Sequence, residues 1–123
     1  MNREKVSPAM RTGKVGTVAE QRTGKVFKAR MTVGSGAFRQ KSDGEFTSGD
    51  DGFRFENKAT EQKSMSLKRD WLEKISREAH GSQQIPLLTL QFMDGEHLRP
   101  YGAWVCLPEA EFKRLLELAN ADS

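Results

Sequence analysis

The order of elements predicted from this chain indicates an α/β domain, in which helices flank a central mixed β-sheet. The 123 residues are enough for one hydrophobic core but not for two. The hydrophobic periodicity predicts, in order, a helix, three strands, a helix, two strands and a helix. Residues 85–92 form an apolar run with little alternation, as expected of a strand buried on both faces. Helices interspersed with strands in one small domain favour this class.

The first part of the chain predicts an arm and a helix. Residues 1–14 mix basic residues with Ser, Pro and Gly, and are expected to form a mobile basic arm. The arm precedes a single domain at residues 15–119. An apolar stripe of Val, Ala and Phe predicts a helix near residues 15–29, although three glycines weaken its propensity.

A set of strands is predicted next. A short strand is expected at residues 30–33. Residues 37–43 and 53–60 then form a hairpin, joined by the Gly- and Asp-rich turn at residues 47–52. Asp43 lies in or just after the first strand of this hairpin.

The remainder predicts a helix between two groups of strands and a final helix. Residues 67–79 carry an apolar face, with Ser64 or Ser66 as the expected N-cap and Gly81 at the end. After the strand at 85–92, residues 93–96 turn the chain.

A strand at residues 103–107 and a helix at 108–119 complete the predicted domain, and residues 120–123 form a tail. Pro108 suits the first turn of that helix. Trp71 and Trp104 fit apolar faces and are expected in the core. Four apolar residues of the last helix are expected to point inward: Phe112, Leu115, Leu116 and Ala119.

The charge of the chain is distributed unevenly. Residues 1–50 carry ten Lys and Arg against five Asp and Glu, whereas residues 51–123 carry ten against twelve. Basic charge in the first part, together with a pI of about 9.2, favours a polyanionic partner such as nucleic acid. A solvated basic surface without a specific partner is the alternative.

Composition also restricts the class of protein. No apolar run approaches the roughly 20 residues of a membrane span, and the N-terminus has no apolar signal segment, so we expect an intracellular, cytoplasmic protein. The single cysteine, Cys106, cannot form an internal disulfide and is expected to be a small buried hydrophobe. His80 and His97 have no partners at zinc-ligand spacing, and residues 34–36 lack the remainder of a phosphate-binding P-loop.

The strand at residues 53–60 carries a candidate for catalysis. Since side chains alternate along a strand, Phe53 and Phe55 share one face, while Glu56 and Lys58 lie side by side on the other. With a second carboxylate from Asp43, this face could hold a divalent cation and orient a water. The alternative is a surface strand with a Glu–Lys pair. Asp50 and Asp51 lie nearer in sequence and are alternative ligands, although they fall in the turn.

A set of short motifs resembles a known family. The motifs are GSGA at residues 34–37, KSD at 41–43, ENKAT at 56–60 and SMSLKRDWLEKI at 64–75. Together they are similar to small Holliday-junction-resolvase-like nucleases, many of them phage-encoded, of the PD-(D/E)XK restriction-endonuclease-like class. The resemblance covers roughly residues 14–116. Ser42 stands where the family usually has proline or glycine.

The resemblance implies a site and a function. Asp43 and Glu56 would bind Mg²⁺, with Mn²⁺ as a substitute, and Lys58 would assist the attacking water. Glu20 matches a further acidic position on the first helix, and its alternative is a solvated helix carboxylate. Arg30, Arg39 and Lys41 are expected phosphate contacts, and Ser35 in the glycine-flanked loop is assigned to the DNA-binding residues as well.

The expected activity is metal-dependent cleavage of branched DNA, as by a Holliday junction resolvase. A symmetric junction needs two cuts, so a C2 homodimer is expected. A nicking or recombination-associated nuclease of the same fold, and a non-catalytic DNA-binding module, are the alternatives.

Overall fold

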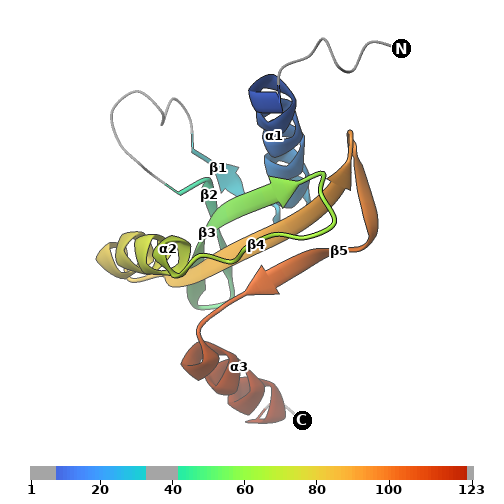
Figure 1. Ribbon diagram of the computed structural model, residues 1–123. Coiled ribbons are helices and arrows are strands. Elements are labelled where there is room, and N and C mark those ends of the chain that lie inside the picture. Colours follow the sequence, from blue (N-terminus) through green and yellow to red (C-terminus); the bar gives the residue numbers. More distant parts are fainter. Residues whose placement is uncertain (1–7, 33–41, 122–123) are drawn as a thin grey trace.

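The computed structural model describes residues 8–32 and 42–121, with residues 8–14 as backbone only. Five strands form one mixed sheet in the order β1-β2-β3-β4-β5, and three helices accompany it (Figure 1). The strands β3 and β4 are parallel and the other neighbours antiparallel. The predicted α/β class, the mixed sheet and the order of elements are therefore confirmed.

The first helix, α1 (Pro8–Phe27), is longer than predicted and includes half of the expected arm. Pro8 suits the start of a helix, because its fixed φ is helical and its missing N–H needs no partner there. The helix ends at Lys28, whose φ of 52° is left-handed, and the Ala29 N–H bonds back to the Gly24 carbonyl at 2.8 Å. Glycine or asparagine is the usual left-handed residue at the end of a helix, so Lys28 gave no signal in the sequence that the helix ends there.

The first three strands place a hairpin beside α1. They are β1 (Arg30–Met31), β2 (Gly44–Ser48) and β3 (Asp51–Thr60). The first strand of the hairpin was predicted at residues 37–43, of which residues 37–41 lie outside the described part. For residues 42 and 43 the prediction was wrong, because β2 starts only after Asp43. Gly44 allows this start, because a Cβ there would lie 2.6 Å from the ring of Phe55.

The second helix, α2 (Arg69–Gly81), begins two residues later than predicted. Its N-cap is Lys68, which makes no side-chain capping bond, so the prediction of Ser64 or Ser66 as the cap was wrong. Residues 64–67 have no regular secondary structure, and Leu67 lies in the wall of an apolar pocket.

The last two strands are β4 (Ile85–Asp94) and β5 (His97–Cys106). The second is longer than the predicted 103–107 and includes Pro100, which is tolerated because β5 is an edge strand. The register shifts between Gln91 and Met93, and Tyr101 in this irregularity has a φ of 56°.

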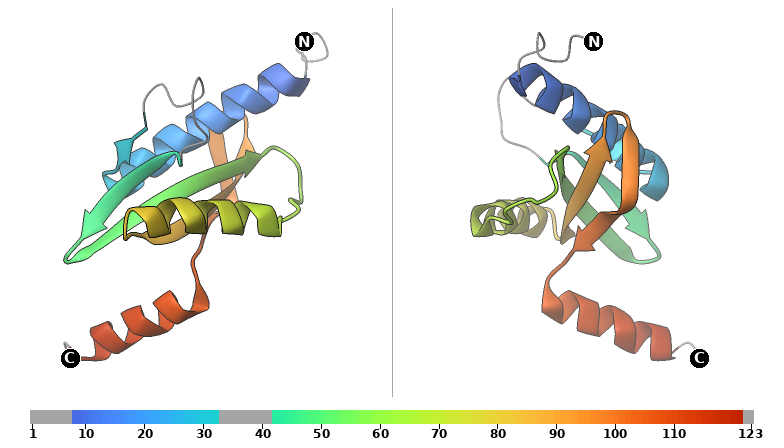
Figure 2. Two further views of the ribbon diagram at one scale, coloured as in Figure 1. Left: turned by 90° about the vertical axis from the view of Figure 1, so that its left-hand side faces the viewer. Right: turned by 45° about the vertical axis from the view of Figure 1, so that its right-hand side comes forward.

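The sheet separates α1 from α2, which lie on its opposite faces (Figures 1 and 2). Under α1 the core has two clusters, one around Phe53, Phe55, Ile85 and Leu87 and one around Val15, Ala19 and Met93. The opposite face packs Ile75 of α2 near Leu88 of β4. No helix among the described residues is both long and apolar enough to cross a membrane.

The third helix, α3 (Glu109–Ala121), projects away from the sheet (Figure 2). The prediction of an inward apolar face was wrong within this chain, because no residue of α3 is buried. Phe112 is 53% exposed and Leu116 is 49% exposed, and Trp104 on β5, also expected in the core, is 58% exposed. Sequence periodicity identifies an apolar stripe but not what covers it.

Candidate functional site

The site begins with the two faces of β3. Phe53 and Phe55 point into the core, as predicted, and are 8% and 0% exposed. On the other face the Lys58 Nζ lies 3.7 Å from Glu56 Oε2. Lys58 also lies over the Trp71 ring of α2, 4.7 Å from its centroid. The predicted Glu–Lys pair is therefore present.

Asp43 lies beside this pair, at the point where β2 begins. Its N–H donates to the Phe55 carbonyl at 2.9 Å, and its Oδ2 accepts from the backbone N–H of Asn57 at 2.7 Å. The preceding Ser42 is buried, and its hydroxyl accepts a bond from Arg54 at 2.9 Å, which gives this serine a structural role.

The alternative ligands lie elsewhere. Asp51 starts β3 at the turn of the hairpin, where its carboxylate pairs with Arg114 of α3 at 3.1 Å. Five residues of strand separate it from Glu56, or about 16 Å. Asp50 lies in the same turn and is exposed.

Glu20 reaches the same place from α1. Its pKa is raised from 4.5 to about 7, by burial first and then by the neighbouring Asp43 and Glu56 carboxylates. The pKa of Glu56 is also raised from 4.5 to about 7, by burial first and then by Asp43, against the opposing effect of Lys74 and Lys58. The carboxylates of Glu20 on α1, Glu56 on β3 and Asp43 just before β2 thus lie close enough to act on one another, which favours either a shared proton or a cation.

These residues fit a hard divalent cation. Glu56 Oε1 is buried and has no hydrogen-bond partner among the described residues, so it is an oxygen available to an ion. In the described part of the chain no three His, Cys, Asp or Glu side chains are grouped as a complete metal site. Mg²⁺ requires less, because it typically binds through one or two carboxylates and fills its shell with water and substrate phosphate.

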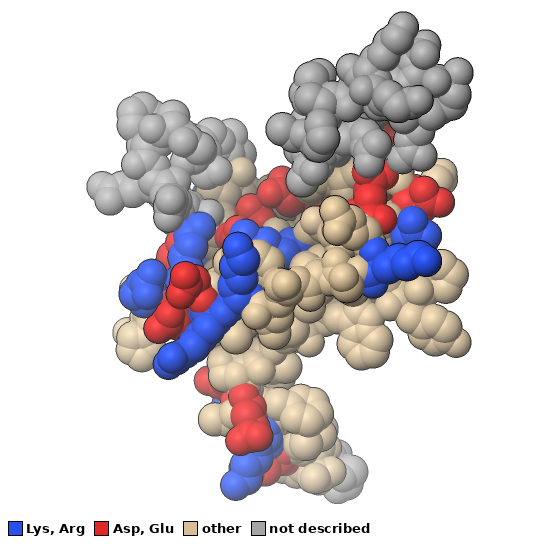
Figure 3. Space-filling model, viewed as in Figure 1, with Lys and Arg blue, Asp and Glu red and all other residues tan. Residues whose placement is uncertain are grey.

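The predicted DNA contacts are only partly visible. Arg30 lies exposed on the edge strand β1, in register with Glu45. Ser35, Arg39 and Lys41 lie outside the described residues. Figure 3 shows Lys and Arg side chains gathered over α2, with acidic residues between them. The residues of α2 and its N-cap that carry this charge are Lys68, Arg69, Lys74 and Arg77.

Sequence reasoning missed several residues near the carboxylates. Lys74 and Glu78, one turn apart on α2, both act on the pKa of Glu56. Asn57, between Glu56 and Lys58, was not singled out from the sequence, yet its backbone N–H holds the Asp43 carboxylate. A signal was available for Thr89 and Gln91, because polar residues at alternate positions of an apolar strand indicate a buried polar contact.

Comparison of the chain with family models, with curated proteins and with solved structures found no match. Any assignment of function therefore depends on the geometry of the site and on the residues themselves.

Proposed function

We propose that this protein is a metal-dependent endodeoxyribonuclease with a restriction-endonuclease-like core, and that it cuts branched DNA as a Holliday junction resolvase. The observation that carries the proposal is the convergence of Glu20, Asp43 and Glu56 beside Lys58. Burial first, and then the neighbouring Asp43 carboxylate, raise the pKa of both glutamates to about 7. A site that concentrates negative charge in this way is suited to a divalent cation and a phosphate.

In this proposal Asp43 and Glu56 hold Mg²⁺, or Mn²⁺ in its place. The metal supplies polarisation of the scissile phosphate and a lowered pKa for a bound water. Lys58 orients that water or offsets charge on the phosphate, and its partial exposure of 30% leaves Nζ accessible to a substrate. Glu20 completes the ligand set or orients Lys58.

The DNA backbone would lie across the basic residues of α2, with Arg30 and the predicted contacts Ser35, Arg39 and Lys41. Contacts to phosphates carry no sequence information, which suits an enzyme selecting a DNA shape. Affinity should fall steeply with salt, because each neutralised phosphate releases counterions.

A homodimer is part of the proposal, because opposite strands of a junction need two sites. The support is apolar surface without a partner in the described chain: Trp104 and Val105 on β5, and Phe112 and Leu116 on α3, are each 45–58% exposed. An isolated helix of 13 residues is marginal in water, so α3 needs a partner for its stripe.

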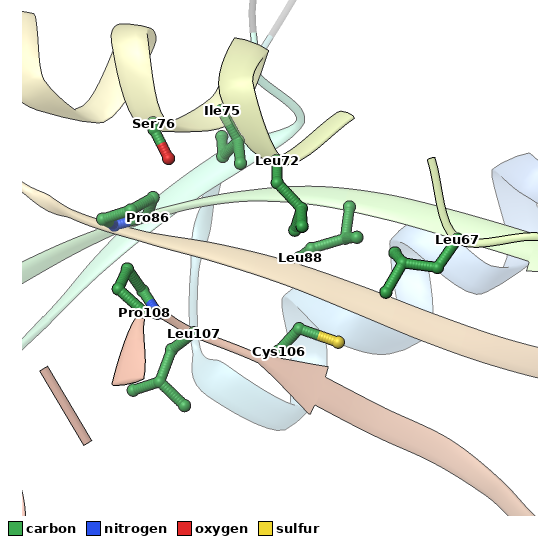
Figure 4. A pocket seen from close by; sticks show the side chains of 9 residues that line it. All are labelled: Leu67, Leu72, Ile75, Ser76, Pro86, Leu88, Cys106, Leu107 and Pro108. Atoms are coloured by element: carbon green, nitrogen blue, oxygen red, sulfur yellow. The ribbon is translucent and has the colours of Figure 1, made fainter. Parts of the chain in front are cut away.

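A pocket next to α3 offers a place for that stripe. It has a volume of about 300 Å³, and Figure 4 shows apolar side chains from α2, β4 and the end of β5 around it. Pro108 lines the pocket, and its carbonyl accepts hydrogen bonds from the N–H groups of Glu111 and Phe112. The helix therefore starts directly at the pocket, without a flexible linker that would let α3 of the same chain fold back into it. Arg114 further ties α3 to Asp51. We therefore expect the pocket to take the apolar stripe of α3 from a second copy of the chain.

The experiment is a cleavage assay on four-way junction, flap, nicked and linear duplex DNA, with Mg²⁺ or with EDTA. Preferential, Mg²⁺-dependent cutting of the junction supports the resolvase. Preference for another substrate indicates a nicking or recombination-associated nuclease. DNA binding without cleavage of any substrate contradicts the proposal and indicates a non-catalytic DNA-binding module.

A further inference from the structure

Four polar side chains are buried between α1 and the sheet, where apolar packing would be expected. Thr23 of α1 is 2% exposed, Asn57 of β3 is 8%, and Thr89 and Gln91 of β4 are 3% and 1%. Buried polar groups need hydrogen-bond partners to offset their lost hydration. These four residues bond to one another and form a network that joins three elements, in which Asn57 Nδ2 is left without a partner among the described residues.

Gln91 is the centre of this network. Its Nε2 lies 3.0 Å from the Ala19 carbonyl, 2.8 Å from Thr23 Oγ1 and 2.6 Å from Asn57 Oδ1. Its Oε1 accepts a bond from Arg22 Nη1 at 3.1 Å. One side chain of β4 therefore holds two successive turns of α1 and one residue of β3.

Both ends of the network reach the candidate metal centre. The Ala19 carbonyl belongs to the residue directly before Glu20. Asn57 stands between Glu56 and Lys58, and its backbone N–H holds Asp43 Oδ2 at 2.7 Å. Single hydrogen bonds thus join Gln91 to the turn that carries Glu20 and to the residue that holds Asp43.

The apolar contacts of α1 do not supply the same constraint. Val15 and Ala19 pack against Met93, but apolar packing is non-directional. Hydrogen bonds weaken steeply away from their preferred geometry, so they fix the rotation and the position of a helix. The network is therefore suited to setting where Glu20 points.

We propose that Gln91 is a positioning residue for the candidate metal centre. Through Ala19 and Asn57 it fixes α1 against β3, so that the carboxylate of Glu20 stands beside those of Asp43 and Glu56. The inference rests on the proposed metal-dependent function. Gln91 acts through its neighbours, because its side chain contacts Asn57 Oδ1, whereas Asp43 is held by the backbone N–H of Asn57.

Two variants separate positioning from core stability. Gln91→Met keeps an unbranched side chain of similar length and removes the polar contacts of both the amide nitrogen and the amide oxygen. Thr89→Val is the matched control, because Thr89 is equally buried and its hydroxyl lies against Asn57 Oδ1 and the Glu56 backbone carbonyl of β3, but among the described residues it makes no bond to α1. Urea unfolding measures how much each variant loses in stability.

Binding of Mn²⁺ to the metal-free protein, measured by calorimetry, is the main readout. We expect Gln91→Met to weaken binding about 10- to 100-fold, as for other residues that orient metal ligands, and Thr89→Val to leave it within about twofold. In a Glu20→Gln background, Gln91→Met should add little further loss, since residues that act through one another are not additive. Residual dipolar couplings of the metal-free protein should show a changed orientation of α1 in Gln91→Met but not in Thr89→Val.

Wild-type Mn²⁺ affinity in Gln91→Met, or full additivity with Glu20→Gln, would overturn the positioning role. A wild-type protein that binds no Mn²⁺ would instead overturn the proposed metal-dependent function, and the role of Gln91 at a metal centre with it. The dipolar couplings then still decide whether Gln91 fixes α1 against the sheet.

Discussion

The backbone N–H of Asn57 donates a 2.7 Å hydrogen bond to the carboxylate of Asp43. A carboxylate that accepts a backbone N–H is held more strongly than a neutral acceptor would be. The register that pairs Gly44 with Phe55 brings Asp43, one residue further, level with Glu56. The bond therefore holds one proposed metal ligand beside the strand that carries the other.

Replacing Glu56 or Lys58 by alanine should abolish or strongly reduce cleavage while leaving folding nearly intact. Neither side chain belongs to the apolar clusters on the other face of β3. We expect a loss of kcat of about 10²–10⁴-fold for Lys58→Ala, the range found for groups that assist proton transfer. Exposed Lys63→Ala is the control and should keep its kcat. Unfolding of either site variant at much lower urea would mark the pair as structural.

Asp43→Asn should lose Mg²⁺-dependent cleavage, whereas Asp51→Asn should retain it. Asp43 raises the pKa of both Glu20 and Glu56, but Asp51 pairs with Arg114 at the far end of β3. The two substitutions make the same chemical change, so single-turnover rates compare the two positions directly. Retained cleavage in Asp43→Asn together with its loss in Asp51→Asn would reverse the ligand assignment.

Without metal, the protein should lose stability as the pH rises from about 4.5 to about 7. Glu20 and Glu56 have folded-state pKa values of about 7 against ordinary values of 4.5, mainly because they are buried beside Asp43. Across this window the folded protein holds protons that the unfolded chain has released, so deprotonation favours unfolding, and the loss ends above pH 7.

Thermal unfolding in EDTA measures this dependence, and Glu56→Gln serves to isolate it. The variant should show a shallower decrease and exceed the wild type in stability at pH 8. Excess Mg²⁺ should stabilise the wild type at pH 8, because a ligand of the folded state alone shifts the equilibrium toward it. Equal slopes in EDTA for the variant and the wild type would show that Glu56 does not carry the raised pKa.

The sequence predicted those features that depend on local pattern. The alternation of Phe53 and Phe55 with Glu56 and Lys58 fixed the two faces of β3, and the apolar run at 85–92 identified the buried strand. Features that depend on tertiary approach were missed. The start of β2 depends on the ring of Phe55 lying against Gly44, and no pattern in the chain reports that contact.

The carboxylates of the site were identifiable by motif, but their support was not. Glu20 lies 23 residues before Asp43, and only the packing of α1 on the sheet brings the two together. Gln91 is distant from both in sequence, and its bonds to Ala19 and Asn57 require the folded arrangement. Long-range contacts of this kind leave only a weak local signal, such as a polar residue in an apolar strand.

The two copies of a homodimer should each insert the apolar stripe of α3 into the pocket of the other. Cys106, the single cysteine, lines that pocket and reports on its occupant. A Phe112→Cys, Cys106→Ser chain mixed with wild type should therefore form a disulfide between the two chains under mild oxidation. Lys113→Cys in the same background is the control. Residue 113 lies about 100° around the helix from residue 112, so this variant should form far less of the disulfide.

Sedimentation at micromolar concentration gives the independent measurement. We expect a dimer for the wild type and a monomer for Phe112→Glu, because a charge would have to enter an apolar pocket without a partner. The cleavage of opposite strands should then lose its coordination in Phe112→Glu, while single nicks persist. A wild-type protein that is strictly monomeric and still cuts DNA would contradict the dimer and favour a single-strand nicking enzyme. A Phe112→Cys chain that links only to its own Cys106 would show instead that α3 closes on its own pocket.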